Sequence, residues 1–388
     1  MIEPKLRFKA DDGSQFPDWE KKKLEDVVEF LDGQRKPLEA GQRVSGKYPY
    51  YGASGIIDYV EDYIFDEELI LLSEDGANIL DRNYRVCFLA KGKYWVNNHA
   101  HVLRAMDGNV NGFICEQLET FDYRKYNSGG AQPKLNQATC RAIIMNMPSL
   151  PEQQKIAEFL STIDTVIKKQ KETVSAWEER KKGVMQKLFS QEVRFKADDG
   201  SEFPEWEEKK LNEVGDIVTG NTPSTKQNDY YGECYLWVTP TDITDSREVT
   251  STAKMLTELG YTVARHIPAN SILVTCIASI GKNAILRENG SCNQQINSIT
   301  PYDEYSVEFV YYLICQNEKL LHANAGTGGM EILNKENFSK IKMYFPCLEE
   351  QRKIADCLSS LDDVIEKQKA TLAAWEELKK GLLQQMFV

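Results

Sequence analysis

Two long stretches of the chain, residues 150–189 and 348–387, carry hydrophobic side chains at alternating steps of four and three residues. A seam of this kind, continued for more than four heptads, predicts a long helix that packs along another helix as a coiled coil. The predicted seam positions are Ile156, Leu160, Ile163, Ile167, Gln170, Val174 and Trp177 in the first stretch, and Ile354, Leu358, Leu361, Ile365, Gln368, Leu372 and Trp375 in the second.

The two stretches are copies of one another, with 24 identical residues in 40 positions at a constant offset of 198. Polar residues interrupt both seams at matched positions, Gln170 with Gln368 and Lys181 with Lys379. Because polar residues at core positions commonly fix register, this matching favours two helices that pack on each other. We expect them to run antiparallel. The alternative is that each helix packs on its own domain.

Local signals mark the start of the first helix. Ser149 and Glu152 have the spacing of a capping box, and Pro151 suits the first helical turn. At a rise of ~1.5 Å per residue, each predicted helix is about 58 Å long. In the antiparallel arrangement the second helix ends beside the start of the chain, which brings Val388 near Met1.

A shorter segment is also written twice. RFKADDGSQFPDWE (7–20) recurs as RFKADDGSEFPEWE (194–207), at an offset of 187. Asp and Gly within it favour a tight turn, and its aromatic residues serve as apolar anchors. The segment therefore predicts a joint between a helix and a domain. The predicted anchors are Phe8, Phe16 and Trp19 in the first copy and Phe195, Phe203 and Trp206 in the second.

The segments between these repeats alternate short apolar runs with Gly, Asn and Pro turns, which predicts mostly β domains with some helix. They resemble each other weakly at residues 96–103 and 292–299, at 111–118 and 306–313, and in two glycine loops, 128–136 and 326–334. The order of repeated segment, variable segment and helix, which occurs twice along the chain, predicts an α+β fold. In this fold two β-rich domains are separated by two long helices, which form an antiparallel coiled coil with pseudo-two-fold symmetry. We place the domains at 1–149 and 191–347 and the helices at 150–190 and 348–388.

Cysteine usage and charge restrict the function. The 388 residues include nine cysteines without a Cys-x-x-Cys pair, and the N-terminal segment lacks an apolar signal core. These features predict a cytoplasmic protein with reduced thiols and without a zinc ribbon. The net charge of −12 argues against a general phosphate-binding protein, because nucleic-acid-binding proteins usually carry a basic face.

No stretch has the pattern of an active site. Residues 41–48, GQRVSGKY, have the spacing of a Walker A loop, but Tyr48 stands where a Ser or Thr would bind Mg²⁺. The Asn-Pro-Pro-Tyr/Phe tetrapeptide of adenine-amino methylation is missing, and the four histidines do not cluster with cysteines or acids. We therefore predict a non-catalytic chain that holds no metal and no cofactor.

Two variable domains, each followed by a helix such as LPEQQKIAEFL…WEERKKG or LEEQRKIADCL…WEELKKG, resemble the specificity subunit of type I restriction–modification systems. The resemblance covers essentially the whole chain. It implies that each domain is a target-recognition domain that reads one half of a split site in double-stranded DNA. It also implies that the coiled coil acts as a spacer and helps to hold two modification subunits.

The resemblance assigns the chemistry to partner subunits. The modification subunits carry S-adenosylmethionine and methylate adenine N6, and restriction subunits use ATP and Mg²⁺ to translocate and cut DNA. No membrane is involved. Two readers at a fixed separation would place their half-sites about one helical turn of DNA apart, on the order of 10 bp.

Base reading requires polar side chains that reach groove edges, such as Asn or Gln to adenine and Lys or Arg to guanine. In the first domain we expect these contacts from Lys47, Tyr50, Tyr51, Ser54, Asn97, Asn98, His99, Gln132 and Lys134. In the second domain we expect them from Asn221, Thr222, Ser224, Thr225, Lys226, Lys282, Asn283, Gln294, Gln295, Thr327, Gly328 and Gly329. Each of these residues could equally be an ordinary solvated loop position.

Two other functions fit parts of the sequence. A non-catalytic coiled-coil scaffold would bridge two protein partners through the β-rich domains. A self-sufficient DNA methyltransferase is disfavoured by the missing tetrapeptide.

Overall fold

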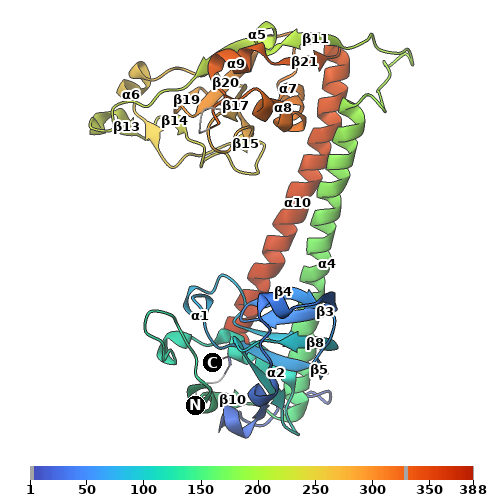
Figure 1. The fold of residues 1–388 in the computed structure, drawn as a ribbon, viewed down its shortest axis with the longest axis vertical. Coiled ribbons are helices and arrows are strands. Elements are labelled where there is room, and N and C mark those ends of the chain that lie inside the picture. The colour runs from blue at the N-terminus through green and yellow to red at the C-terminus, as the bar shows by residue number, and fades with distance from the viewer. Residues whose placement is uncertain (1–3, 327–330, 388) are drawn as a thin grey trace. The chain divides into compact units, whose positions relative to one another are not determined.

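A computed structural model describes residues 4–326 and 331–387 and divides the chain into two compact units. Unit 1 comprises Met1–Glu172 with Ala370–Val388, and unit 2 is Thr173–Lys369. Each unit combines β-sheets with segments of two long helices, α4 (Leu150–Phe189) and α10 (Leu348–Met386) (Figure 1). The α+β fold class is thereby confirmed, and the two long helices lie where the heptad pattern predicts them.

The part of unit 1 that the structure describes contains two four-stranded sheets and one two-stranded ribbon. Its strands are β1 (Glu20–Lys23), β2 (Val28–Phe30), β3 (Ser45–Gly52), β4 (Gly55–Val60), β5 (Phe65–Asp66), β6 (Leu69–Ser73), β7 (Cys87–Ala90), β8 (Lys93–Val96), β9 (Ala100–Ala105) and β10 (Ile144–Met147). Its short helices are α1 (Asn78–Asp81), α2 (Asn111–Thr120) and α3 (Gln137–Arg141). The sheet orders are β2-β9-β6-β7 and β4-β3-β8-β5, and β1 pairs with β10.

The described residues of unit 2 form a five-stranded sheet, a four-stranded sheet and a two-stranded ribbon. Its strands are β11 (Glu207–Lys210), β12 (Gly215–Thr219), β13 (Tyr231–Gly232), β14 (Tyr235–Val238), β15 (Glu248–Val249), β16 (Met255–Leu256), β17 (Ser271–Thr275), β18 (Asn283–Leu286), β19 (Gly290–Cys292), β20 (Ile296–Pro301) and β21 (Lys342–Phe345). Its short helices are α5 (Leu211–Val214), α6 (Glu258–Val263), α7 (Val307–Gln316), α8 (Glu318–Ala323) and α9 (Lys335–Lys340). The orders are β12-β20-β17-β18-β15 and β13-β16-β14-β19, with β11 on β21.

The two units share one sheet plan. The order β2-β9-β6-β7 of unit 1 recurs in unit 2 as β12-β20-β17-β18, with β15 added at the edge. The register also recurs, since Phe30 faces Leu103 in unit 1 and Ile217 faces Ile299 in unit 2. The weak sequence matches predicted this relation correctly, because they lead into β9 and β20 and fall on α2 and α7.

Charged pairs show the direction of the long helices within each unit. In unit 1 the Lys379 Nζ atom lies 2.6 Å from Asp164 Oδ1, and Lys171 pairs with Glu376. Because the partner number on α10 falls as the number on α4 rises, the helices are antiparallel there.

Unit 2 repeats both charged pairs at an offset of 198. Lys181 lies 2.5 Å from Asp362, and Glu178 pairs with Lys369. The two lysines that interrupt the hydrophobic seams thus each form an ion pair between α4 and α10, one in each unit.

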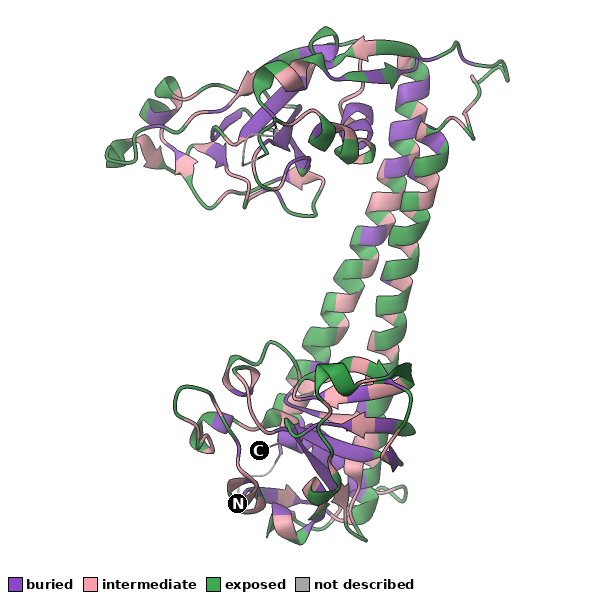
Figure 2. Ribbon diagram, in the orientation of Figure 1, coloured by how far each residue is buried: buried purple, intermediate pink, exposed green. Residues whose placement is uncertain are grey.

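The seam positions at the start of each long helix also belong to a domain core. Ile156, Leu160 and Ile163 pack with α2 and the sheet in unit 1, and Ile354 and Leu358 do the same in unit 2. Figure 2 marks the buried residues, which lie in the sheets and in parts of both long helices. Helix pairing and packing on the domain therefore occur together. The remaining seam residues are buried (Val174, Ile365) or half-buried (Ile167, Gln170, Trp177, Leu361, Gln368, Leu372, Trp375).

The repeated segment 7–20 binds the start of α4 through Glu152, which is fully buried. The Glu152 carboxylate accepts hydrogen bonds from Arg7 Nε (3.1 Å) and Nη2 (2.9 Å) and from Trp19 Nε1 (3.2 Å). The Arg7 guanidinium also donates to the Pro17 carbonyl at 2.8 Å. The segment therefore forms the predicted joint, held by a buried ion pair as well as by aromatic anchors.

The second copy of the segment makes the same contacts. Arg194 donates to Glu350 at 3.1 and 2.8 Å, and Trp206 Nε1 donates to Glu350 at 3.2 Å. Because the carboxylate is used in this way, the predicted capping box at Ser149 is wrong: Glu152 bonds to Arg7 and Trp19, and the buried Ser149 hydroxyl has no partner.

The last turns of α10 pack on the core of unit 1. The Leu6 amide donates to the Gln385 carbonyl at 3.0 Å, and the Phe387 ring lies 5.6 Å from that of Phe113. The second helix therefore ends beside the first copy of the repeated segment, as predicted, while the expected neighbours Met1 and Val388 lie outside the described residues. Of the described helices, none has both the length and the apolar composition to cross a bilayer.

Candidate nucleic-acid interface

Four loops of unit 1 meet where β3 and β6 end and where β9 begins. The Glu74 amide donates to the His99 carbonyl (2.8 Å), and the Leu135 amide donates to the Glu74 carbonyl (2.7 Å). The Ser73 hydroxyl donates to the carbonyl of Ala53 at 2.5 Å. These bonds join the loops at 53–54, 74–76, 97–99 and 128–135, which we call loop cluster 1.

Unit 2 builds the same arrangement with different residues. The Cys276 amide donates to the Gln295 carbonyl (2.8 Å), and the Leu333 amide donates to the Cys276 carbonyl (2.9 Å). The Asn221 amide donates to the Cys292 carbonyl at 2.9 Å and so brings the loop after β12 to the same place. We call these loops, at 221–222, 276–282, 293–295 and 331–334, loop cluster 2.

The structure gathers many of the predicted site residues in these clusters. Exposed side chains in cluster 1 are Ser54, Asn98, His99, Gln132 and Lys134, and in cluster 2 they are Thr222, Lys282 and Gln294. Three further residues are half-buried beside them: Tyr51, Asn221 and Gln295. The Thr222 hydroxyl donates to Gln294 Oε1 at 2.5 Å, which links two of the predicted readers directly.

Other predicted residues lie elsewhere. Lys47 is exposed near the start of β3, where its ammonium sits over the Tyr48 ring. Ser224, Thr225 and Lys226 are exposed in the segment that directly follows the first loop of cluster 2, residues 221–222. Thr327, Gly328 and Gly329 lie outside the described residues.

Three of the predicted readers are buried, and their polar atoms serve the protein itself. Tyr50 is 1% exposed, and its hydroxyl accepts a hydrogen bond from the Leu38 amide. Asn97 accepts from the His99 amide, and Asn283 donates to the Gly281 carbonyl. We remove these three from the proposed base readers, because a side chain inside the core does not reach a DNA groove.

Sequence reasoning missed the charged residues that support cluster 1. Arg35 Nη1 donates to Glu74 Oε2 and to the Ala100 carbonyl, both at 2.7 Å. Lys134 lies 3.4 Å from the other oxygen of Glu74, and His99 bonds to Asp75. No local pattern joins residues 35, 74 and 99, so only the folded chain reveals this network.

His101 also supports cluster 1, although it was not among the readers expected from the sequence. It is 1% exposed, and its ring atoms Nδ1 and Nε2 lie 2.7 Å from Asp32 Oδ2 and 2.8 Å from the Leu135 carbonyl. Burial alone would lower the pKa of His101, but the hydrogen bond to Asp32 reverses this and raises the pKa to about 10. Burial would likewise raise the pKa of Asp32, and the hydrogen bond from His101 lowers it. The pair is therefore ionic at neutral pH.

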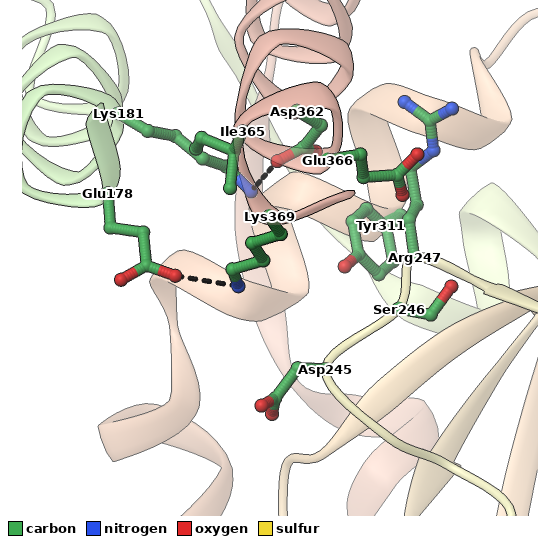
Figure 3. A pocket seen from close by; sticks show the side chains of 10 residues that line it. All are labelled: Glu178, Lys181, Asp245, Ser246, Arg247, Tyr311, Asp362, Ile365, Glu366 and Lys369. Carbon is green, nitrogen blue, oxygen red and sulfur yellow. Dashed lines mark ion pairs between the residues drawn. The ribbon is translucent and has the colours of Figure 1, made fainter. Parts of the chain in front are cut away.

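A crevice lies between the domain and the long helices in each unit. In unit 2 it has a volume of 410 Å³, and Figure 3 shows that Lys181 and Lys369 on its helix wall pair with Asp362 and Glu178. The larger crevice of unit 1 is lined by the equivalent helix residues, including Asp164 and Lys379. These charges neutralise one another, so they act as structural pairs. Among the described residues, no group of three or more His, Cys, Asp or Glu is placed to hold a metal ion.

Known proteins are similar to this chain in sequence and in fold. A family model described as the type I restriction modification DNA specificity domain matches the chain twice, at residues 17–175 and 204–374. The specificity subunit of the type I restriction enzyme MjaVIII of Methanocaldococcus jannaschii is 24% identical over 412 residues, which cover 97% of this chain and 94% of that protein. The MjaIX specificity subunit of the same organism is 33% identical over 211 residues, 52% of this chain and 48% of its own.

A solved structure extends the likeness to the fold. The crystal structure of the type I restriction–modification S subunit from M. genitalium matches with a TM-score of 0.67 at 14% sequence identity. The match covers 100% of this chain and 99% of that one.

Proposed function

Because the chain belongs to the family of type I restriction–modification DNA specificity proteins, we propose that its two loop clusters each read one half of a bipartite DNA site. One observation carries this proposal above the others. The same backbone arrangement occurs in both units, with equivalent hydrogen bonds from Leu135 and Leu333, while the exposed side chains differ. A conserved frame with divergent surface residues is what two readers of different base sequences require.

We assign recognition to residues 1–149 and 191–347, and spacing to the helices at 150–190 and 348–388. The proposed base readers are the exposed residues of the two clusters, which carry amide, hydroxyl, imidazole and ammonium groups suited to groove edges. Half-sites about one turn of DNA apart, on the order of 10 bp, fit two readers held by a helical spacer.

The chain itself supplies specificity, and partner subunits supply the reactions. We propose that two modification subunits dock on it, use S-adenosylmethionine and methylate adenine N6, and that restriction subunits use ATP and Mg²⁺ to cut DNA. Because this chain has a net charge of −12, we propose that the partner subunits make most of the contacts to the DNA phosphates.

Sequencing of methylated adenines in cells that express the chain with its modification subunits tests the proposal. The expected result is methylation within one bipartite, asymmetric sequence whose two halves flank a spacer of fixed length. Methylation that is independent of the chain, or that falls in one contiguous sequence, would contradict it. A catalytically inactive modification subunit serves as the control.

A further inference from the structure

The pair His101–Asp32 lies directly beneath the glycine loop of cluster 1. The side chains of His101 and Asp32 are only 1% and 9% exposed, and both ring nitrogens are engaged, one by Asp32 and one by the Leu135 carbonyl. Glu74 and Arg35 complete the charged surroundings, at 3.8 Å from His101 and 3.6 Å from Asp32 respectively. With no ring nitrogen left free, the imidazole is neither a general base nor a metal ligand.

The Leu135 carbonyl is the point at which this pair holds the loop. On one side of Leu135, the loop closes on itself, since the Ser128 amide donates to the Lys134 carbonyl at 2.8 Å and the Asn127 side chain accepts from the Lys134 amide at 2.9 Å. A side chain at Gly129 would overlap the Gln132 carbonyl, so the loop has a compact and specific shape. The hydrogen bond that holds the Leu135 carbonyl therefore also helps to position the exposed side chains of Gln132 and Lys134.

In unit 2 an uncharged pair of residues holds the equivalent carbonyl, that of Leu333. Asn297 Nδ2 donates to the Leu333 carbonyl at 2.8 Å, and the Thr219 hydroxyl donates to Asn297 Oδ1 at 2.6 Å. Thr219 faces Asn297 in the register of β12 and β20. Continuing the register of β2 and β9 from Phe30 and Leu103 by two residues places Asp32 opposite His101. The two pairs are equivalent in position and hold equivalent carbonyls.

We propose that His101–Asp32 and Asn297–Thr219 are the positioning pairs of the two DNA-reading loops, each tuning discrimination at one half-site without touching DNA. This inference rests on the proposed function. The pairs act through Leu135 and Leu333, so each affects only the loop cluster of its own unit. In unit 2 the Leu333 amide donates to the Cys276 carbonyl and the Cys276 amide donates to the Gln295 carbonyl, so Asn297 supports the loops that carry Lys282 and Gln294. Transplanting one pair into the other unit is then expected to preserve the loop, because each pair supplies an N–H to the carbonyl at the equivalent position, Leu135 or Leu333.

The test uses the full chain assembled with its modification subunits and a target sequence mapped by methylated-adenine sequencing. Equilibrium binding is measured for the target and for two duplexes, each altered in one half-site. His101→Ala is expected to lower discrimination at the half-site read by the first domain by about ten- to a hundredfold, the usual effect of losing a hydrogen bond to a charged group. Asn297→Ala is expected to do so at the other half-site only.

The double variant Asp32→Thr, His101→Asn carries the pair of unit 2 into unit 1 and is expected to restore discrimination. The inference would be overturned if His101→Ala lowered discrimination equally at both half-sites or at neither. It would also be overturned if the double variant discriminated as poorly as His101→Ala. If His101→Ala fails to fold, the double variant alone decides. A wild-type complex without discrimination at either half-site would instead remove the proposed function itself.

Discussion

Replacing Glu152 by alanine is expected to destabilise unit 1 by about 3–5 kcal/mol, because it leaves the Arg7 guanidinium largely buried and without its carboxylate. The same change also removes the acceptor of Trp19 Nε1. Urea unfolding followed by circular dichroism measures the loss. Glu350→Ala is the matched variant of the second joint and is expected to destabilise unit 2 by a similar amount, since Arg194 and Trp206 make the same contacts.

Asp11→Ala is the control for the Glu152 variant. The Lys155–Asp11 pair joins the same segment to the same helix, but Asp11 is 96% exposed. Exposed ion pairs contribute little because water and salt screen them, so this variant should unfold almost as the wild type does. An equal effect of Glu152→Ala and Asp11→Ala would show that the buried carboxylate does not hold the joint.

The second large effect is expected from Lys379→Glu. Lys379 is buried, and its Nζ atom lies 2.6 Å from Asp164 and 3.3 Å from Glu116. A third carboxylate at this place leaves the buried charges unbalanced, and we expect a loss of about 3–5 kcal/mol in the stability of unit 1. Urea unfolding followed by circular dichroism measures this loss of stability as well.

Lys181→Glu is the equivalent change in unit 2 and should cost less. Lys181 is more exposed than Lys379 (21% against 10% of the side chain), and the neighbour of its partner Asp362 is the hydroxyl of Tyr312. The charge exchange Lys379→Glu with Asp164→Lys should recover part of the loss, because it restores the pair between the two positions but leaves Glu116 beside a second carboxylate. Equal effects of the two single variants, or no recovery on exchange, would contradict the assigned pairing.

The periodic parts of the fold were predictable because their signals are local. A seven-residue repeat determines where a helix is buried, so α4 and α10 followed from the sequence, and the matched lysines marked polar layers. Their partners Asp164 and Asp362 were not predictable, because they lie off the hydrophobic seam and meet the lysines only when α4 and α10 pair. Arg7 was missed for the same reason, since Glu152 lies 145 residues away along the chain.

The candidate site was predictable only in part. Polar residues near glycines marked the loops of both clusters, and Asn98, Gln132 and Gln294 are exposed there. Sequence does not distinguish a polar side chain that faces solvent from one that is buried in the domain, and so Tyr50, Asn97 and Asn283 were expected as readers although they are buried. The supporting pair His101–Asp32 joins β9 to the turn that follows β2, and these two segments are neighbours in the fold but distant in sequence.

Exchange of residues 20–149 for the corresponding segment of a related protein tests most directly whether each domain reads one half-site. The exchanged chain is expressed with the same modification subunits, and methylated adenines are sequenced across the genome. We predict that one half of the target changes while the other half and the spacer length stay the same. An unchanged target, or a change in both halves, would contradict the assignment of one half-site to each domain.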